Sequence, residues 1–395
     1  MPKGLLPLSS YPCLFFALLF TGSCFHKKEQ QQAPVYTGLA ILKEFDKSRT
    51  FDTTSDATAP MYFRPVKIDV FYPSAEKPAR PPLTYGQLLD QYEQRINYKT
   101  PIDSCRRTSQ ALAASIAEYL HVENAFKILG YKMDIYDSLQ WPVRRSPLII
   151  YAAGMNGSSW ENPILFDSLA KRGYVVAAIS SVGKYPGYMT APIDLDEQVR
   201  DILFTRQTMS ALPFIDTSRI GLLSWSLGGS SATKAAMANQ DFKALLSFDG
   251  TEIHYYGTDT AWDTWYTQNR QIPPFDPGQI TTPYLYLSSE HPAVFDSVYL
   301  LPRYMRSKHN YFLKLNKSIH EDFSSIVTIA KAVSPELIDI DSARHSMVCS
   351  LAGVFFDEYL KPLDEQEPPT VSTRGYINQL LTDRPASFDT TYPHR

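Results

Sequence analysis

The chain has few cysteines, no excess of either charge and no long apolar segment. Its 4 cysteines in 395 residues are too few for the disulfide framework of a small secreted protein. Lys and Arg number 38 against 41 Asp and Glu, and this net charge of −3 gives no electrostatic basis for binding nucleic acid. No internal repeat is evident at periods of about 20–50 residues, which argues against a solenoid or a propeller.

The motifs of metal-dependent and nucleotide-dependent catalysis are also missing. The sequence has no H-E-x-x-H, no Walker A pattern and no cysteine–histidine cluster with zinc spacing. The acidic pairs at 194–196 and 339–341 are interpreted as solvated helix or turn carboxylates. The sequence therefore predicts neither a metal ion nor a cofactor.

The N-terminus has the pattern of a targeting segment. The apolar run Cys13–Phe20 is too short to span a bilayer but suits a signal peptide. Thr21-Gly22-Ser23-Cys24 follows and resembles the lipobox of bacterial lipoproteins, whose cysteine is acylated after cleavage. We expect a signal peptide at 1–23, lipid on Cys24 and a polar tether over 24–34. This predicts a protein anchored in the bacterial cell envelope, or secreted if Cys24 is not acylated.

Apolar strands alternate with helical segments along most of the chain. A hydrophobic fraction of 44% is enough for a large core. The alternation predicts a mostly parallel, doubly wound α/β sheet with helices on both faces. We expect one domain over 35–361 with a mainly helical insertion at about 84–141, then a C-terminal extension at 362–395. The expected strands are 36–42, 66–73, 147–152, 174–179, 220–223, 244–248, 283–287 and 311–315, with 66–73 antiparallel.

The insertion contains one clear helical pattern, near Thr108–Leu129. Leu112, Ile116, Leu120 and Phe126 recur at helical spacing and are expected to face inward. Two cysteines remain outside the targeting segment, at 105 and 349. Both a disulfide between them and two buried free thiols fit the sequence.

The segment 220–238 reads as a strand, a sharp turn and a helix. Ile220–Leu223 is a short apolar strand, and Gly228–Ala238 is a helix rich in small residues. Ser226 lies between them in Ser224-Trp225-Ser226-Leu227-Gly228, the form of a G-x-S-x-G nucleophile elbow with Ser224 in place of the first glycine. The strained turn requires small residues two positions either side of the nucleophile. A serine-rich junction without catalytic meaning is the alternative, and the strand–helix context favours Ser226 as a nucleophile.

A serine nucleophile needs a base and a third group that orients the base. Chemistry in open α/β sheets collects beyond the carboxyl ends of the strands, where His320 follows the last expected strand. His345, at the start of the last expected helix, is the rival base. The remaining histidines, in the tether, the tail, a helix or before the last strand, are His26, His121, His254, His291, His309 and His394.

Two carboxylates are candidates for the third group. Asp249 directly follows the strand after the elbow helix, and Glu290 follows the next strand, where most α/β-hydrolases place their acid. Either carboxylate can reach a histidine loop above the sheet. The chain order Ser, then acid, then His is the order expected of α/β-hydrolases.

These motifs resemble the platelet-activating-factor acetylhydrolase and dienelactone-hydrolase-like branch of the α/β-hydrolases. The resemblance rests on Ser226-Leu227-Gly228-Gly229, Leu246-Ser247-Phe248-Asp249-Gly250 and His320-Glu321-Asp322-Phe323, and it spans about 67–360. It implies the α/β-hydrolase fold and favours Asp249 as the acid. Ser224 and Ala153 depart from the residues that are usual in this branch.

An oxyanion hole needs two donors aimed at the developing negative charge. The backbone N–H of Leu227, directly after the nucleophile, is one expected donor. The resemblance implies Met155 as the second. The predicted function is hydrolysis of a carboxylic ester through an acyl-enzyme, by Ser226, His320 and Asp249.

The expected substrate is a small-molecule, lipid or sugar ester, with membrane contact through the lipid anchor and no nucleic acid. An amidase or peptidase of the same fold and a catalytically inactive binding lipoprotein are the alternatives, although a binding module needs no complete Ser, Asp and His set. Aromatic residues suited to acyl or sugar recognition, or to loop packing, are Tyr255, Tyr256, Trp262, Trp265 and Tyr266.

Overall fold

The computed structural model describes residues 35–190, 192–253, 260–273, 275–290, 300–337, 341–361, 371–383 and 388–390. The predicted signal peptide, Cys24 and the tether lie outside these residues. Within the described ranges, no helix combines the length and the apolar character needed to cross a membrane.

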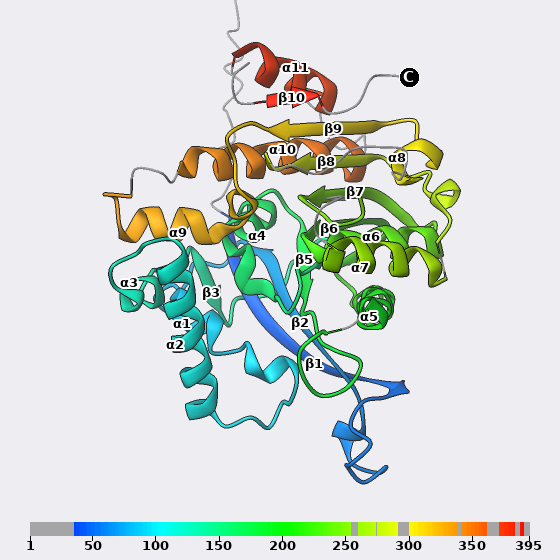
Figure 1. Cartoon of the computed structure of the whole chain (residues 1–395). Coiled ribbons are helices and arrows are strands. Elements are labelled where there is room, and N and C mark those ends of the chain that lie inside the picture. Colours follow the sequence, from blue (N-terminus) through cyan, green and yellow to red (C-terminus); the bar gives the residue numbers. More distant parts are fainter. Residues whose placement is uncertain are drawn as a thin grey trace, which may run out of the picture. The chain divides into compact units, whose positions relative to one another are not determined.

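The described residues form a ten-stranded sheet whose central strands are parallel (Figure 1). The strand order is β10-β9-β8-β7-β6-β4-β5-β2-β1-β3. Strands β4 to β9 are parallel to their neighbours among themselves, whereas β2 is antiparallel to β5 and β1. The strands are β1 Tyr36–Thr50, β2 Phe63–Ser74, β3 Ile135–Asp137, β4 Ser146–Ala152, β5 Val175–Ile179, β6 Ile215–Trp225, β7 Phe242–Phe248, β8 Tyr284–Ser288, β9 Asn310–Leu315 and β10 Phe388–Thr390.

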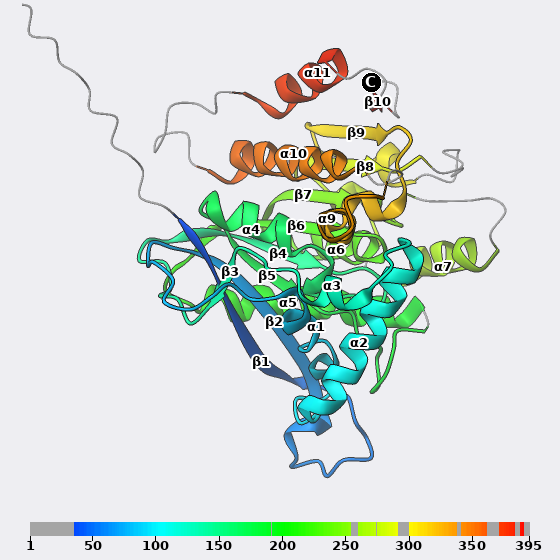
Figure 2. The same cartoon turned by 90° about the vertical axis from the view of Figure 1, so that its left-hand side faces the viewer.

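Alternating side chains of the central strands build one core on each face of the sheet. In β4, Ile149 and Tyr151 join the first core, while Leu148 and Ile150 join the second. Helices α1–α4 and α9–α11 pack on the first core, and α5–α8 pack on the second. Figure 2 shows α2, α3 and α9 in front of the sheet, on the side that is at the left in Figure 1. This confirms the predicted mostly parallel sheet with helices on both faces. The helices are α1 Tyr85–Leu89, α2 Ile102–Tyr119, α3 Ala125–Leu129, α4 Pro163–Lys171, α5 Pro192–Ser210, α6 Leu227–Ala238, α7 Thr260–Gln271, α8 Leu300–Tyr304, α9 Ser325–Val333, α10 Ser342–Leu360 and α11 Thr373–Asp383.

The helical pattern expected over 108–129 is divided into two helices, α2 and α3. The chain leaves α2 through His121, whose φ of 57° lies in the left-handed region and cannot continue a right-handed helix. Asn124 then caps α3, because its side chain accepts a hydrogen bond from the N–H of Phe126. The prediction for Phe126 is wrong: it sits in the first turn of this new helix and is 69% exposed. Ile116 and Leu120 are buried as expected.

The polar helix α5 is held against β1 and β2 by buried ion pairs. Asp201 Oδ1 lies 2.6 Å from Arg49 Nη2, and Asp201 Oδ2 lies 2.6 Å from Arg64 Nη2. Arg49 also pairs with Glu197 of the same helix at 3.0 Å. Asp194 and Asp196 are buried as well, and Asp196 pairs with Lys234 at 2.6 Å, so the prediction of solvated carboxylates at 194–196 is wrong.

The C-terminal extension and the cysteines are also placed within this fold. Strand β10 pairs antiparallel with β9, so part of the extension adds the outermost strand on that side of the sheet. Cys105 on α2 and Cys349 on α10 are both free and buried. The alternative of two unpaired thiols is therefore the one that the structure supports.

Candidate active site

Ser226 occupies the sharp turn between β6 and α6. Its backbone has φ 56° and ψ −129°, a positive φ that is strained for a residue with a side chain. The N–H of Ser226 donates to the carbonyl of Phe248 at 3.0 Å, and its own carbonyl accepts from the N–H groups of Gly229 and Thr251. These bonds from β7 and the following loop hold the strained turn. The side chain is partly exposed, as a nucleophile requires.

The small residues around Ser226 have separate structural reasons. A β-carbon on Gly228 would lie 2.1 Å from the carbonyl oxygen of Ala152, so only glycine lets α6 pack against the end of β4. Ser224 is fully buried, and its hydroxyl donates to the carbonyl of Leu246 on β7 at 3.3 Å. The serine that replaces the usual first glycine is therefore accommodated by a hydrogen bond to the neighbouring strand.

Asp249 and His320 meet beyond the ends of β7 and β9. The distance between His320 Nδ1 and Asp249 Oδ2 is 2.6 Å. Asp249 is buried and also accepts from the Ser289 N–H at 2.8 Å and the Ser289 hydroxyl at 2.6 Å. These donors orient the carboxylate, and the carboxylate in turn fixes the imidazole with Nδ1 toward it.

The His320 ring is held between Asp249 and Trp225. Its centroid lies 4.7 Å from the Trp225 ring, at an interplanar angle of 22°, and Trp225 Nε1 donates to the His320 carbonyl at 3.3 Å. Burial alone would lower the pKa of His320, but the hydrogen bond and charge of Asp249, together with the charge of Glu321, raise it above its ordinary value.

No hydrogen bond joins Ser226 to His320 among the described residues. Such bonds are often long in the absence of substrate and tighten only in the substrate complex. The Trp225–His320 stack nonetheless brings the ring beside the residue that precedes Ser226. A serine at a strained turn, next to an imidazole–carboxylate pair, is an arrangement suited to nucleophilic catalysis.

The rival residues lie in other surroundings. Glu290 is exposed, and its carboxylate accepts from the N–H of Lys317 at 2.5 Å, in the loop that leads to His320. His345 is buried in α10, where burial lowers its pKa to about 4 and its ring contacts Thr328 and Asn162. Glu290 therefore shapes a loop, and His345 belongs to the core. The histidines at 254 and 291 lie outside the described residues.

The segment 153–158 follows β4, and a β-carbon on its Gly154 would lie 3.3 Å from Ser226 Cβ. It is called the oxyanion loop below, after the oxyanion donor that the sequence predicts at Met155. Met155 is 41% exposed at its tip, and Asn156 has a left-handed φ of 58°. Asn156 is fixed on both sides: its carbonyl accepts from the Tyr92 hydroxyl at 2.5 Å, and its side chain exchanges two hydrogen bonds with Met189. The N–H of Leu227 opens helix α6 and has no intrahelical acceptor.

Two buried glutamates near this site were not identified from the sequence. Burial raises the pKa of Glu161 to about 8 and that of Glu252 to about 7. Glu161 ends a single turn, Ser159–Glu161, directly before α4, and in the sequence it looks like an acidic residue at a helix start. Glu252 accepts from the Tyr284 hydroxyl at 2.7 Å. In the sequence, each of these glutamates is only a carboxyl residue between two apolar segments, and that pattern does not predict burial beside the site.

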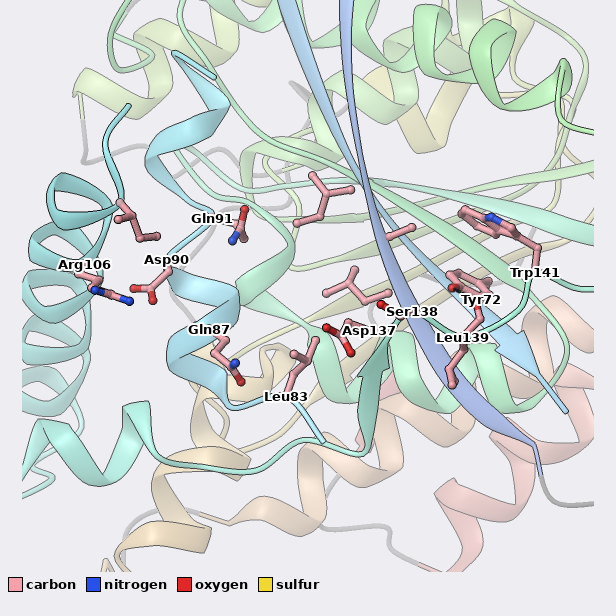
Figure 3. A pocket seen from close by; sticks show the side chains of 14 residues that line it. Tyr72, Leu83, Gln87, Asp90, Gln91, Arg106, Asp137, Ser138, Leu139 and Trp141 are labelled. Carbon is pink, nitrogen blue, oxygen red and sulfur yellow. Dashed lines mark hydrogen bonds between the residues drawn. The ribbon is translucent and has the colours of Figure 1, made fainter. Parts of the chain in front are cut away.

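A cavity of about 630 Å³ lies elsewhere, between β1, β3 and the helical insertion (Figure 3). Its lining includes Gln87, Asp90, Arg106, Asp137 and Trp141 and none of the predicted site residues. No group of three potential metal-ligating side chains is found in the described part of the chain. Of the predicted aromatic cluster, Trp265 packs on the second core, and the other four side chains lie outside what the structure describes.

No protein-family model and no curated protein matches the sequence. Among solved structures, a ferulic acid esterase from Streptomyces cinnamoneus aligns with a TM-score of 0.60 at 16% identity, over 92% of this chain and 98% of its own. DcsB in complex with a substrate analogue aligns with a TM-score of 0.39 at 17% identity, over 56% of this chain and 92% of its own. Pyrococcus horikoshii acylaminoacyl peptidase aligns with a TM-score of 0.42 at 18% identity, over 57% of this chain and 39% of its own. Together with the strand order and the elbow between β6 and α6, the first alignment shows that this chain has the α/β-hydrolase fold.

Proposed function

We propose that this protein is a serine hydrolase that cleaves a carboxylic ester through Ser226, His320 and Asp249. The observation that carries the proposal is the 2.6 Å contact between His320 Nδ1 and Asp249 Oδ2, beside a serine with a φ of 56°. A binding protein has no need of a strained serine next to an oriented imidazole. The position of Asp249 after β7 also supports placement in the acetylhydrolase and dienelactone-hydrolase-like branch.

In the proposed reaction, Ser226 Oγ attacks the ester carbonyl carbon while His320 Nε2 takes the hydroxyl proton. Asp249 stabilises the imidazolium that forms, and the N–H groups of Leu227 and Met155 donate to the oxyanion. Collapse of the tetrahedral intermediate releases the alcohol, which receives the proton from His320. Water, deprotonated by His320, then attacks the acyl-enzyme and releases the carboxylic acid and free Ser226.

The test is turnover of p-nitrophenyl esters of graded acyl length, a feruloyl ester and a p-nitroanilide, by wild type and Ser226→Ala. The feruloyl ester is included because the ferulic acid esterase shares the fold. We expect ester turnover that Ser226→Ala abolishes, with labelling of Ser226 by a fluorophosphonate. Preferential turnover of the anilide would support the amidase alternative instead. Neither turnover nor labelling would overturn the proposal and favour a binding lipoprotein.

We further propose that Cys24 carries the lipid anchor. The support is the sequence Thr21-Gly22-Ser23-Cys24 after an apolar run, since the residues concerned lie outside the described part of the chain. Expression in a bacterium with labelled palmitate should give a labelled protein in the membrane fraction. Cys24→Ser should lose both the label and the membrane association. A labelled Cys24→Ser protein would contradict acylation at this position.

A further inference from the structure

The Glu161 carboxyl group is enclosed by the oxyanion loop. Only 1% of the residue is exposed. Its Oε2 accepts hydrogen bonds from the Gly154 N–H at 3.1 Å and from the Tyr151 hydroxyl at 2.7 Å. A β-carbon on Gly157 would lie 1.7 Å from Oε1, so the loop can close around this carboxyl only with glycine there.

The same carboxyl group lies close to the nucleophile. A β-carbon on Gly154 would be 3.0 Å from Glu161 Oε1 and 3.3 Å from Ser226 Cβ, so both atoms lie within 3.3 Å of one point. The Glu161 carbonyl accepts from the Ser324 hydroxyl at 2.6 Å, directly after the turn that carries His320. Glu161 therefore contacts the oxyanion loop through its side chain and the His320 segment through its backbone.

The surroundings of Glu161 favour the neutral acid. The titratable groups that act on the Glu161 carboxyl are the Tyr151 hydroxyl and the His320 imidazole, and Glu161 in turn acts on the hydroxyls of Tyr85, Tyr92 and Tyr151. Both observed hydrogen bonds reach Oε2, and no described residue donates to Oε1. An ionised carboxylate on a residue that is only 1% exposed would have two neutral donors to offset its lost hydration, which costs more than burying the neutral acid. Burial accordingly raises the pKa of Glu161 to about 8.

We propose that Glu161 is a positioning residue for the reaction proposed above and that it acts in its neutral form. By accepting from Gly154, it fixes the Ala153–Gly154 peptide, one residue before the Met155 N–H, and so helps to direct that N–H toward the oxyanion. A carboxylic acid provides this contact without placing a negative charge beside the developing oxyanion. This inference rests on the proposed hydrolase function, and it adds a second ionisation to the pH dependence of that function.

An ionised Glu161 would have two opposing effects. Its charge would favour the His320 imidazolium and disfavour the oxyanion. Asp249, at 2.6 Å, already stabilises the imidazolium, and Glu161 is the smallest of the charge effects that raise the pKa of His320. The oxyanion forms next to Ser226 and the peptide that Glu161 contacts, so repulsion of the oxyanion prevails. Turnover therefore requires neutral His320 and neutral Glu161, which limits activity at both ends of the pH range.

The experiment compares the pH profiles of wild type, Glu161→Gln, Glu161→Ala and Tyr151→Phe on the ester that wild type turns over fastest. Wild-type kcat should fall by roughly tenfold per pH unit above about pH 8. Glu161→Gln keeps an uncharged acceptor for Gly154, so it should retain turnover at neutral pH and lose this alkaline decline. Glu161→Ala should lose roughly 10²–10³ in kcat with little change in KM. Tyr151→Phe removes a bond that lowers the pKa of Glu161 and should move the decline to higher pH.

An alkaline decline that persists in Glu161→Gln, or a decline that stays in place in Tyr151→Phe, would overturn the inference. A second readout needs no turnover and separates this failure from failure of the hydrolase proposal. The pKa of Glu161 is raised from 4.5 to about 8 on folding, so its contribution to stability is complete below about pH 4.5 and is lost as the pH rises toward 8. As the pH rises across this interval, the unfolding midpoint of wild type should therefore fall relative to that of Glu161→Gln. Parallel curves would show that Glu161 is ionised when folded.

Discussion

The indole of Trp225 stacks on the imidazole of His320, with ring centroids 4.7 Å apart, and also donates to the His320 carbonyl. Trp225 directly precedes Ser226, so the residue before the proposed nucleophile positions the ring of the proposed base. Trp225→Ala should therefore lower kcat by about tenfold or more, because the ring loses its stacking partner and its fixed orientation. Trp225→Phe keeps a stacking surface and should retain more activity. Equal losses in the two variants, measured on one ester, would contradict a role for the stack.

The second prediction separates the two candidate acids. Asp249→Asn removes the charge that stabilises the His320 imidazolium and should lower kcat by roughly 10³–10⁴. Glu290→Gln is the matched control, because it also removes one carboxylate charge near the His320 loop but leaves the 2.6 Å contact intact. It should change kcat little. A large loss in Glu290→Gln with a small one in Asp249→Asn would exchange their roles.

The pH dependence of the base gives the third prediction. The charge of Glu321 is one of the causes that raise the pKa of His320. His320 must be neutral to accept the serine proton, so kcat/KM should rise with pH through its pKa. Glu321→Gln should lower that pKa and move the rising part of the profile to lower pH. The measurement is kcat/KM between about pH 5 and 8, and an unmoved profile would show that Glu321 does not act on the ring.

The sequence was sufficient for the centre of the sheet, because central strands are buried on both faces and appear as apolar runs, but it did not predict the short edge strands β3 and β10. Strands β4 to β9 all overlap predicted segments, although β6 spans Ile215–Trp225 where 220–223 was expected. The elbow was evident because a side chain at its small positions would collide with backbone, as at Gly228. The single helix expected over 108–129 failed because a local cap at Asn124 outweighed the helical spacing of apolar residues. A helix cap such as Asn124 depends on one side-chain hydrogen bond, so it leaves the spacing of apolar residues in the sequence almost unchanged and is easily missed.

The site was less accessible from the sequence than the fold. Ser226, Asp249 and His320 were selected because each follows a strand at the same edge of the sheet. The choice between Asp249 and Glu290 depended on a resemblance, since both follow neighbouring strands and only tertiary structure shows which one contacts His320. Glu161 was missed because its meaning lies in burial and in the closure of a loop around it. Neither the burial of a carboxyl group nor the closure of a loop around it produces a local sequence pattern.

The last prediction concerns the buried charges that join α5 to β1 and β2. Asp201 pairs at 2.6 Å with both Arg49 and Arg64, and all three side chains are buried. Asp201→Asn should therefore lower the free energy of unfolding by about 3–5 kcal/mol, because it leaves Arg64 without its only carboxylate partner among the described residues.

Asp241→Asn is the matched control, since this carboxylate is 59% exposed and pairs with one arginine, Arg206. Its loss should cost less than about 1 kcal/mol. Denaturant unfolding of both variants measures the difference. Equal stabilities would mean that solvent reaches the Asp201 cluster, because only a cluster closed to water makes the loss of one carboxylate so costly.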